Sequence, residues 1–170
     1  LAGKNVRDKD AVVSCLLIAE MAAVSASQGE TLVDRLEHFY EQYGHKAENT
    51  ISIIREGKTG LEKIAEVMRI LRDDPFSGFE SLGILTLSDF LTGQKQVLAT
   101  QEVTELDYPE SNVLLYQLSG LDFMCVRPSG TEPKIKVYFG CYGKDRAICE
   151  ARQQAYETIV LARVNTLLGP

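Results

Sequence analysis

An α+β fold with a mostly antiparallel sheet is the architecture that this sequence predicts. Helical periodicity is seen in residues 8–44, 59–73 and 144–164, whereas residues 81–142 form a succession of short strand-like runs. Strands that follow one another in the chain, with helices kept apart from them, are typical of α+β folds. With 170 residues, the chain is long enough for one well-buried domain, or for one domain and a piece of another.

The first expected helix runs from about Asp8 to Ser27, and Asp8 and Asp10 place negative charge at its N-terminus. This helix is apolar almost all round, which is typical of burial on several sides. We therefore expect it to be the last helix of a preceding domain. Without that domain it would expose an apolar patch, through which two copies could associate by residues 11–24.

Turn and capping residues set the next elements. Thr31 can cap a second helix that runs to about Gly44, and residues 46–55 alternate as a strand does. The capping-box pattern at residues 59–62 predicts a third helix, which ends before Pro75. We place a domain boundary just before the second helix, so that residues 1–30 end one domain and residues 31–170 form the next.

The remaining elements are five strands and a closing helix. The strands are expected at 83–87, 97–106, 113–119, 121–127 and 134–142, and Ser119-Gly120 forms a tight hairpin between the third and the fourth. In the last strand, alternation places four residues on one face: Ile135, Val137, Phe139 and Cys141. The closing helix spans about 144–164, with these residues inward: Ile148, Ala151, Ala155, Ile159 and Ala162.

Composition and charge narrow the classes of partner. The net charge is −6 and no basic stripe stands out against 24 acidic residues, so we expect no nucleic-acid surface. No apolar stretch approaches the ~20 residues of a membrane span. The four cysteines lie in apolar segments and have no metal-ligand spacing, so we expect reduced core thiols in a cytoplasmic protein without a metal site. His38 and His45 are expected to be surface or structural residues.

The eight residues from Arg127 to Lys134, Arg-Pro-Ser-Gly-Thr-Glu-Pro-Lys, connect two predicted strands. Arg127 offers the planar fork that matches a phosphate, and Ser129 and Thr131 add hydroxyl donors. Gly130 can take a positive φ that turns successive N–H groups toward one anion. Lys134 is a further candidate contact. The loop therefore predicts a site for the phosphate of a small molecule, while a plain hairpin turn with solvated charges is the alternative.

This segment closely resembles the phosphate-binding loop in the C-terminal domain of the α-D-phosphohexomutases, the phosphoglucomutase/phosphomannomutase superfamily. A second match is Val6-Arg7-Asp8-Lys9-Asp10-Ala11, which resembles the segment after the sugar-binding loop of the third domain in phosphoglucomutases. The resemblance covers essentially the whole chain. It implies the end of domain three followed by domain four, with a TATA-box-binding-protein-like fold.

The resemblance also implies a function. In the family, a phosphoserine of domain one exchanges its phosphoryl group with a hexose phosphate through a hexose bisphosphate, assisted by Mg²⁺ in domain two. Arg127, Ser129, Gly130 and Thr131 match the loop that holds the phosphate that does not react. Lys9 matches a lysine at the substrate, and Arg7 lies nearby.

The serine loop and the metal loop of the family have no counterpart in this chain, so no catalytic residue is expected here. We expect a C-terminal portion that is inactive alone and depends on domains one to three of the same polypeptide. The residues around Lys9 favour phosphoglucomutase, or the related phosphopentomutase branch, over phosphoglucosamine mutase. A stand-alone phosphosugar-binding module and a purely structural α+β domain remain the alternative functions.

Overall fold

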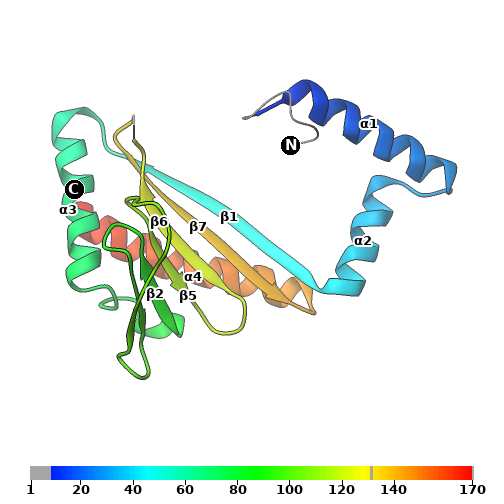
Figure 1. The fold of residues 1–170 in the computed structure, drawn as a ribbon. Coiled ribbons are helices and arrows are strands. Elements are labelled where there is room, and N and C mark those ends of the chain that lie inside the picture. The colour runs from blue at the N-terminus through cyan, green and yellow to red at the C-terminus, as the bar shows by residue number, and fades with distance from the viewer. Residues whose placement is uncertain (1–8, 131, 170) are drawn as a thin grey trace. The chain divides into compact units, whose positions relative to one another are not determined.

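The computed structural model describes residues 9–130 and 132–169 and divides the chain into two compact units, residues 1–44 and 45–170 (Figure 1). Each unit is described by itself. Arg7 and Thr131 lie outside the described residues. The domain boundary expected after residue 30 stays a prediction, and the compact units divide later, between Gly44 and His45.

The first unit contains two helices, α1 (Ala11–Ser27) and α2 (Leu32–Tyr43). Asp10 is the N-cap of α1 and accepts a hydrogen bond from the backbone N–H of Val13 at 3.0 Å. Thr31 is the N-cap of α2, as predicted, and Asp34 completes a capping box because its carboxylate accepts from the backbone N–H of Thr31 at 2.7 Å.

Helix α1 is apolar on all sides, as its sequence predicts, and several of its large apolar side chains are exposed: Val12, Leu16, Leu17, Ile18, Met21 and Val24. Within the described residues, no single helix is long and apolar enough to cross a bilayer. The pair of α1 and α2 would meet the length and composition needed, but the two helices bend by 86° at the break between them.

The second unit is built on a seven-stranded sheet in the order β1-β7-β6-β5-β2-β3-β4, and every pairing is antiparallel. The strands are β1 (His45–Ile54), β2 (Thr86–Asp89), β3 (Gln94–Val97), β4 (Val103–Glu105), β5 (Leu114–Gln117), β6 (Phe123–Pro128) and β7 (Lys134–Gly143). The predicted α+β class and the hairpin at Ser119-Gly120 are therefore confirmed.

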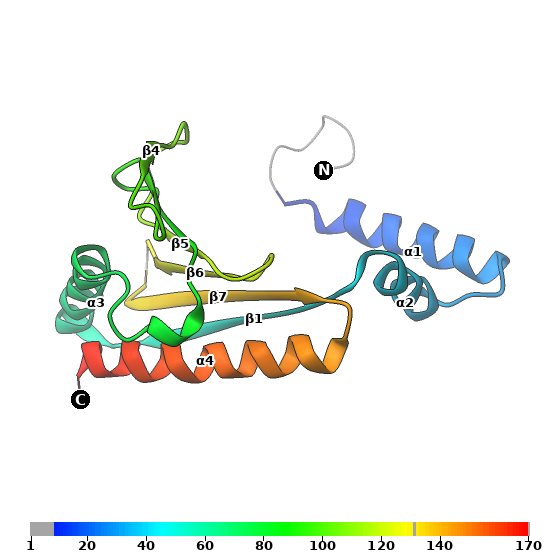
Figure 2. The same cartoon turned by 90° about the horizontal axis from the view of Figure 1, so that it is seen from below.

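Helices α3 (Gly57–Asp73) and α4 (Arg146–Leu168) pack on one face of this sheet, with a 3₁₀ turn at Glu80–Leu82. In Figure 2, α4 runs along β1 and β7 on that face. The core between sheet and helices includes the inward side of β7, where Ile135, Val137, Phe139 and Cys141 are buried as predicted. The other face of the sheet carries no helix of this unit, and Figure 1 looks onto it.

The expected strand 97–106 is wrong, because the chain turns back inside it. β3 ends at Val97 and β4 begins at Val103. Gln101 adopts a φ of 58° at the turn, and its side-chain amide donates to the carbonyl of Leu98 at 2.7 Å. The turn has neither the glycine nor the proline that usually marks such a reversal, so the sequence pattern did not reveal it.

The capping box expected at residues 59–62 does not form. Helix α3 already begins at Gly57, and its N-cap Glu56 makes no side-chain capping bond. Gly60 is buried inside the first turns, where a Cβ would lie 1.8 Å from the carbonyl oxygen of Arg55. A side chain at position 60 would therefore collide with the chain that precedes α3.

The inward face predicted for the closing helix is wrong for four of its five residues, since Ile148, Ala151, Ala155 and Ala162 are exposed. Ile159 is partly buried and packs against the core, as predicted. The fully buried residues of the helix are Cys149, Val160, Val164 and Leu168. The helix also continues beyond the predicted end at residue 164. Its inward side includes Arg152 and Tyr156, which bond to the buried carboxylate of Asp122, and these polar residues disguise the apolar stripe.

The cysteines differ from one another in burial. Cys141 and Cys149 are buried, Cys125 is partly buried and Cys15 is exposed, and all four are free thiols. The expectation of four core thiols is therefore wrong for Cys15, because α1 leaves that side uncovered.

Candidate functional site

Local hydrogen bonds hold the described part of the loop between β6 and β7. The backbone N–H of Ser129 donates to the carbonyl of Lys134 at 2.8 Å, which closes the loop at its base. The N–H of Lys134 donates to the carbonyl of Glu132 at 2.7 Å, and the N–H of Glu132 donates to the hydroxyl of Ser129 at 3.3 Å. The sequence therefore forms a hairpin connection, with Arg127 exposed on the strand that enters it.

The same loop is tied to the edge strand of the sheet. The backbone N–H of Arg55, directly after β1, donates to the carbonyl of Pro133 at 2.9 Å. Three strand ends thus meet here, and the loop is held from both sides.

The negative charge of Glu132 is balanced by a lysine within the loop. Its carboxylate forms an ion pair with the ammonium of Lys134. The hydrogen bond from Lys134 lowers the pKa of Glu132, and the charges of Lys134 and Lys136 lower it further. The predicted site residue Lys134 therefore compensates Glu132, and the repulsion that this carboxylate would exert on an anion is reduced.

Lys136 is a site residue that the sequence analysis did not identify. It lies directly opposite Arg127 in the pairing of β6 with β7, and Ser52 of β1 lies on its other side. The neighbours Val126 and Val137 are buried among the helices, so alternation places Arg127 and Lys136 on the open face. Two cations thus stand side by side next to the loop.

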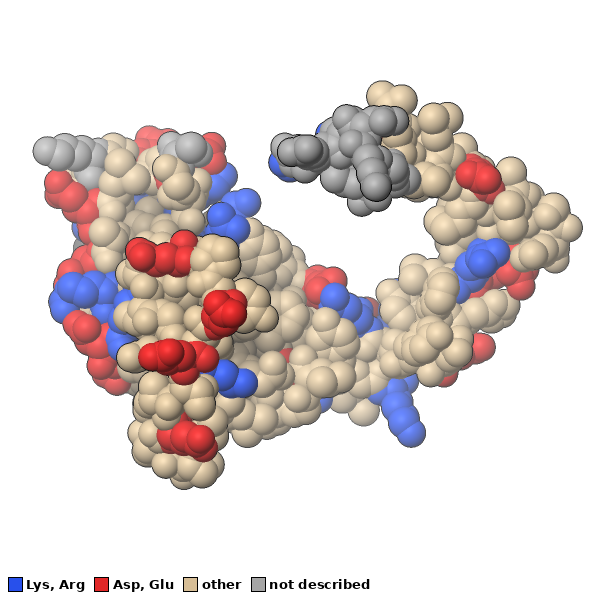
Figure 3. All heavy atoms as spheres, in the orientation of Figure 1, with Lys and Arg blue, Asp and Glu red and all other residues tan. Residues whose placement is uncertain are grey.

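The signal for Lys136 was present but incomplete. Alternation along β7 shows that Lys136 avoids the apolar face, yet only the register of the hairpin shows that its neighbour is Arg127. Figure 3 shows basic atoms near the loop end of β6 and β7, with acidic atoms beside the loop and further acidic atoms over the side of the sheet formed by β2 to β4.

The expected positive φ at Gly130 is not found. Its φ lies outside the left-handed region, and a Cβ there would meet nothing within 4 Å. The loop in this structure therefore does not converge its N–H groups through that glycine. Ser129 is partly buried and uses its hydroxyl to support the turn, and Thr131 lies outside the described residues.

Lys9 is exposed and immediately precedes the N-cap of α1 in the first unit. It belongs to a different unit from Arg127, so the two are described separately. The described residues include no group of His, Cys, Asp and Glu side chains that could hold a metal ion. The described residues thus offer no set of ligands for the Mg²⁺ ion, which the resemblance assigns to another domain.

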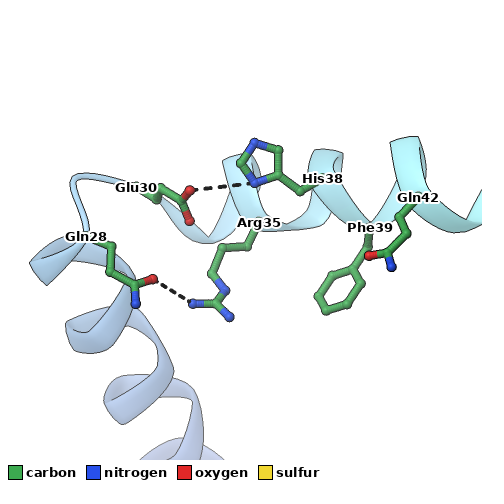
Figure 4. Close-up of a pocket in the computed structure, with 6 residues that line it drawn as sticks. All are labelled: Gln28, Glu30, Arg35, His38, Phe39 and Gln42. Atoms are coloured by element: carbon green, nitrogen blue, oxygen red, sulfur yellow. Dashed lines mark hydrogen bonds and ion pairs between the residues drawn. The ribbon is translucent and has the colours of Figure 1, made fainter.

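A small pocket of about 150 Å³ lies in the first unit where α1 leads into α2 (Figure 4). Arg35 donates to the side chain of Gln28 at 3.4 Å, and His38 lies 3.6 Å from Glu30. Four polar side chains of this pocket thus pair with one another, and His38 is a surface residue, as predicted.

Comparison with known proteins decides the family. Residues 54–157, more than half of the chain, match the family described as "Phosphoglucomutase/phosphomannomutase, C-terminal domain". The chain belongs to this family. The predicted resemblance is therefore confirmed for the part of the chain that carries the loop.

Relatives of this phosphohexomutase domain agree. The chain is 38% identical over 133 residues to the phosphoglucomutase of Staphylococcus aureus (strain MRSA252), a match that covers 78% of this chain and 24% of that protein. It is 37% identical over 139 residues to the phosphoglucomutase of Staphylococcus epidermidis, with 81% and 25% covered. The chain thus spans about a quarter of the length of these relatives.

A solved structure shows the same fold. The structure of the exocytosis-sensitive phosphoprotein pp63/parafusin (phosphoglucomutase) from Paramecium, in its open form, matches with a TM-score of 0.60 at 16% identity. The match covers 96% of this chain and 28% of that one. At this identity the likeness concerns the fold.

Proposed function

We propose that this domain holds the phosphate group of a hexose phosphate within a phosphohexomutase. The observation that carries the proposal is the pair of cations formed by Arg127 and Lys136 beside the Ser129–Gly130 loop. A phosphate monoester needs positive charge together with several donors, and a guanidinium can bind two of its oxygens at once.

In this proposal the bound phosphate is the one that does not react. Binding a remote phosphate uses its interaction energy to position the reacting end of the sugar, where another part of the enzyme performs the phosphoryl transfer. The named relatives favour glucose phosphates as the substrate. The serine nucleophile and the Mg²⁺ site would lie in other parts of the enzyme, so no step of the transfer is assigned to residues described here.

We also propose that the exposed apolar surface of α1 packs against another part of a phosphohexomutase, since the relatives are about four times as long as their matched regions. Leu16 is 66% exposed and Val12 is 72% exposed, which leaves a contiguous apolar surface on this helix. Association of two copies through the same surface is the alternative that the sequence predicts.

Arg127→Ala tests the phosphate site. We expect the affinity for glucose 6-phosphate, measured by calorimetry on the full chain, to fall by about 10- to 150-fold, because a charge-assisted hydrogen bond contributes roughly 1.5–3 kcal/mol. Arg146→Ala is the matched control, since Arg146 is exposed on α4 and pairs with Glu150 on the helix side of the sheet. An unchanged affinity in Arg127→Ala would favour the purely structural reading of the loop.

The proposal also assigns no turnover to the chain by itself. We expect purified chain, supplied with glucose 1-phosphate, glucose 1,6-bisphosphate and Mg²⁺, to form no glucose 6-phosphate above the background of a protein-free mixture. Turnover that is lost in Arg127→Ala would contradict this expectation and would place a complete active site within these residues.

A further inference from the structure

A second hollow lies on the open face of the sheet, on the same side as Arg127 and Lys136. It has a volume of about 500 Å³ and is shallow, and it is lined by Glu48, Asn49, Thr50, Phe123, Tyr138 and Phe139. Strand alternation places the side chains of Glu48, Thr50, Phe123 and Tyr138 on the open face, because their neighbours Ala47 and Met124 are buried under the helices.

The floor of this hollow is aromatic. Phe123 lies opposite Gly140 in the strand pairing, and its ring covers that glycine, since a Cβ on Gly140 would lie 2.3 Å from a ring carbon. Tyr138 lies two residues along β7, and Thr50 is its partner on β1. Two aromatic side chains and two hydroxyl-bearing residues thus lie at neighbouring positions of the open face.

A carboxylate borders the same hollow. Glu48 forms an ion pair with Lys46, and the ammonium of Lys46 lies 5.2 Å from the centre of the Tyr142 ring. The carboxylate oxygens of Glu48 are hydrogen-bond acceptors for hydroxyl groups. The charge of Lys46 offsets that of Glu48, so this end of the hollow does not strongly repel a ligand that also carries phosphate.

The hollow and the cations are close enough for one ligand. Tyr138 is two residues from Lys136 on the same face of β7, which corresponds to about 7 Å along a strand. Apolar C–H surface that can cover an aromatic ring, together with hydroxyls for carboxylate and hydroxyl partners, is the chemistry of a sugar ring. A sugar ring attached to a phosphate at Arg127 and Lys136 would therefore lie within reach of Tyr138.

We propose that this hollow is a subsite for the sugar ring of the phosphosugar, with Tyr138 and Thr50 as its principal contacts. The inference rests on the proposed function, because the sugar ring can reach the hollow only if its phosphate is bound at Arg127 and Lys136. It makes the open face of the sheet a surface that reads the sugar as well as its phosphate.

The test compares two probes, glucose 6-phosphate and inorganic phosphate, on the full chain. Tyr138→Ala is expected to lower the affinity for glucose 6-phosphate about 3- to 10-fold, as expected for loss of an aromatic contact. The affinity for inorganic phosphate is expected to stay within about twofold, because the cations are retained. Saturation-transfer NMR should show transfer from aromatic protons to sugar ring protons in the wild type and a clear loss in Tyr138→Ala.

Matched controls lie elsewhere on the second unit. Thr50→Val should selectively lower the affinity for glucose 6-phosphate, and Thr104→Val should leave it unchanged. Thr104 is a matched control because it lies in the same row across the sheet as Thr50, at the far edge on β4. The residues between them in that row are Tyr138, Cys125, Leu115, Ser88 and Lys95. Tyr108→Ala is the aromatic control, since Tyr108 is exposed and packs edge-on to Phe90 at 5.7 Å.

The outcomes separate the two proposals. If Tyr138→Ala and Thr50→Val weaken both probes equally, or neither, while Arg127→Ala weakens both, the sugar subsite is overturned and the phosphate site stands. If glucose 6-phosphate binds no more weakly to Arg127→Ala than to the wild type, the phosphate site itself is overturned, and the subsite with it.

Discussion

Asp122 lies where β6, β7 and α4 meet, and it is fully buried. Its carboxylate accepts from the backbone N–H of Tyr142 at 2.8 Å, from Arg152 at 3.3 Å and from the hydroxyl of Tyr156 at 3.1 Å. Arg152 also donates to the carbonyl of Tyr142. One side chain thus joins two strands to the helix that covers them, and its charge is paired with that of Arg152.

Asp122→Ala is therefore expected to lower the free energy of unfolding by about 3–5 kcal/mol, because it leaves the partly buried charge of Arg152 without its partner. Urea denaturation followed by circular dichroism measures this change. Glu110→Ala, an exposed acid in the β4–β5 loop, should change it by less than about 0.5 kcal/mol. A loss below about 1 kcal/mol in Asp122→Ala would show that the network contributes little net stability.

The same cluster makes stability depend on pH in the alkaline range. Burial, together with the neighbouring Asp122, raises the pKa of Tyr156 from 10.0 to about 12. A raised pKa in the folded state means that the stabilising contribution is complete below pH 10 and is lost as the pH rises toward 12. Burial and Asp122 raise the pKa of Cys141 in the same way, from 9.0 to about 12.

We expect the melting temperature to fall between pH 9 and pH 11, with Cys141 contributing from the lower end and Tyr156 from about pH 10. Scanning calorimetry across this range should show a smaller fall for Tyr156→Phe than for the wild type above pH 10. Identical falls in both proteins would mean that the phenol does not titrate with unfolding.

At the scale of elements, the pairing of β6 with β7 shows how a glycine and a ring fit together. Phe123 covers Gly140, and any side chain at Gly140 would collide with the ring. Gly140→Ala is expected to cost about 1–3 kcal/mol of unfolding free energy, since the ring must move out of its place. Denaturant unfolding measures it.

Gly130→Ala is the matched control, because its Cβ would meet nothing within 4 Å and its φ lies outside the left-handed region. We expect less than about 0.5 kcal/mol of change there. If the clash is the cause, the double variant Gly140→Ala with Phe123→Leu should lose less than the sum of the two single variants. Additive losses would point to strain in the strand itself.

Helix α4 shows what an element's sequence leaves undecided. Alanines and isoleucines at 148, 151, 155, 159 and 162 form an apolar stripe, yet the structure buries the face of Cys149, Val160 and Val164. Arg152 and Tyr156 lie on that side of the helix, where both bond to the buried carboxylate of Asp122 just before β6. The periodicity of one helix contains no information about Asp122, which directly precedes β6 and lies 30 residues before Arg152 in the chain.

At the scale of the whole molecule, the two units differ in how much they bury. Among the described residues, α1 buries only Ser25 and α2 buries none, whereas the second unit contains a continuous apolar core. We expect amide hydrogen exchange in α1 and α2 to be faster by at least about 100-fold than in β6 and β7, because their helices open without disrupting that core. Equal protection across both units would show that they unfold together.

The sequence by itself determined the α+β class, most of the element order and the family, because these depend on local signals: periodicity, caps, turns and one eight-residue loop. Only the tertiary structure decided the register that sets Lys136 beside Arg127, the ion pair that engages Glu132 with Lys134, and the hollow beside Tyr138. It also decided which face of α4 is buried. Each of these depends on contacts between residues on separate strands and helices, and such contacts leave no periodic trace in either segment alone.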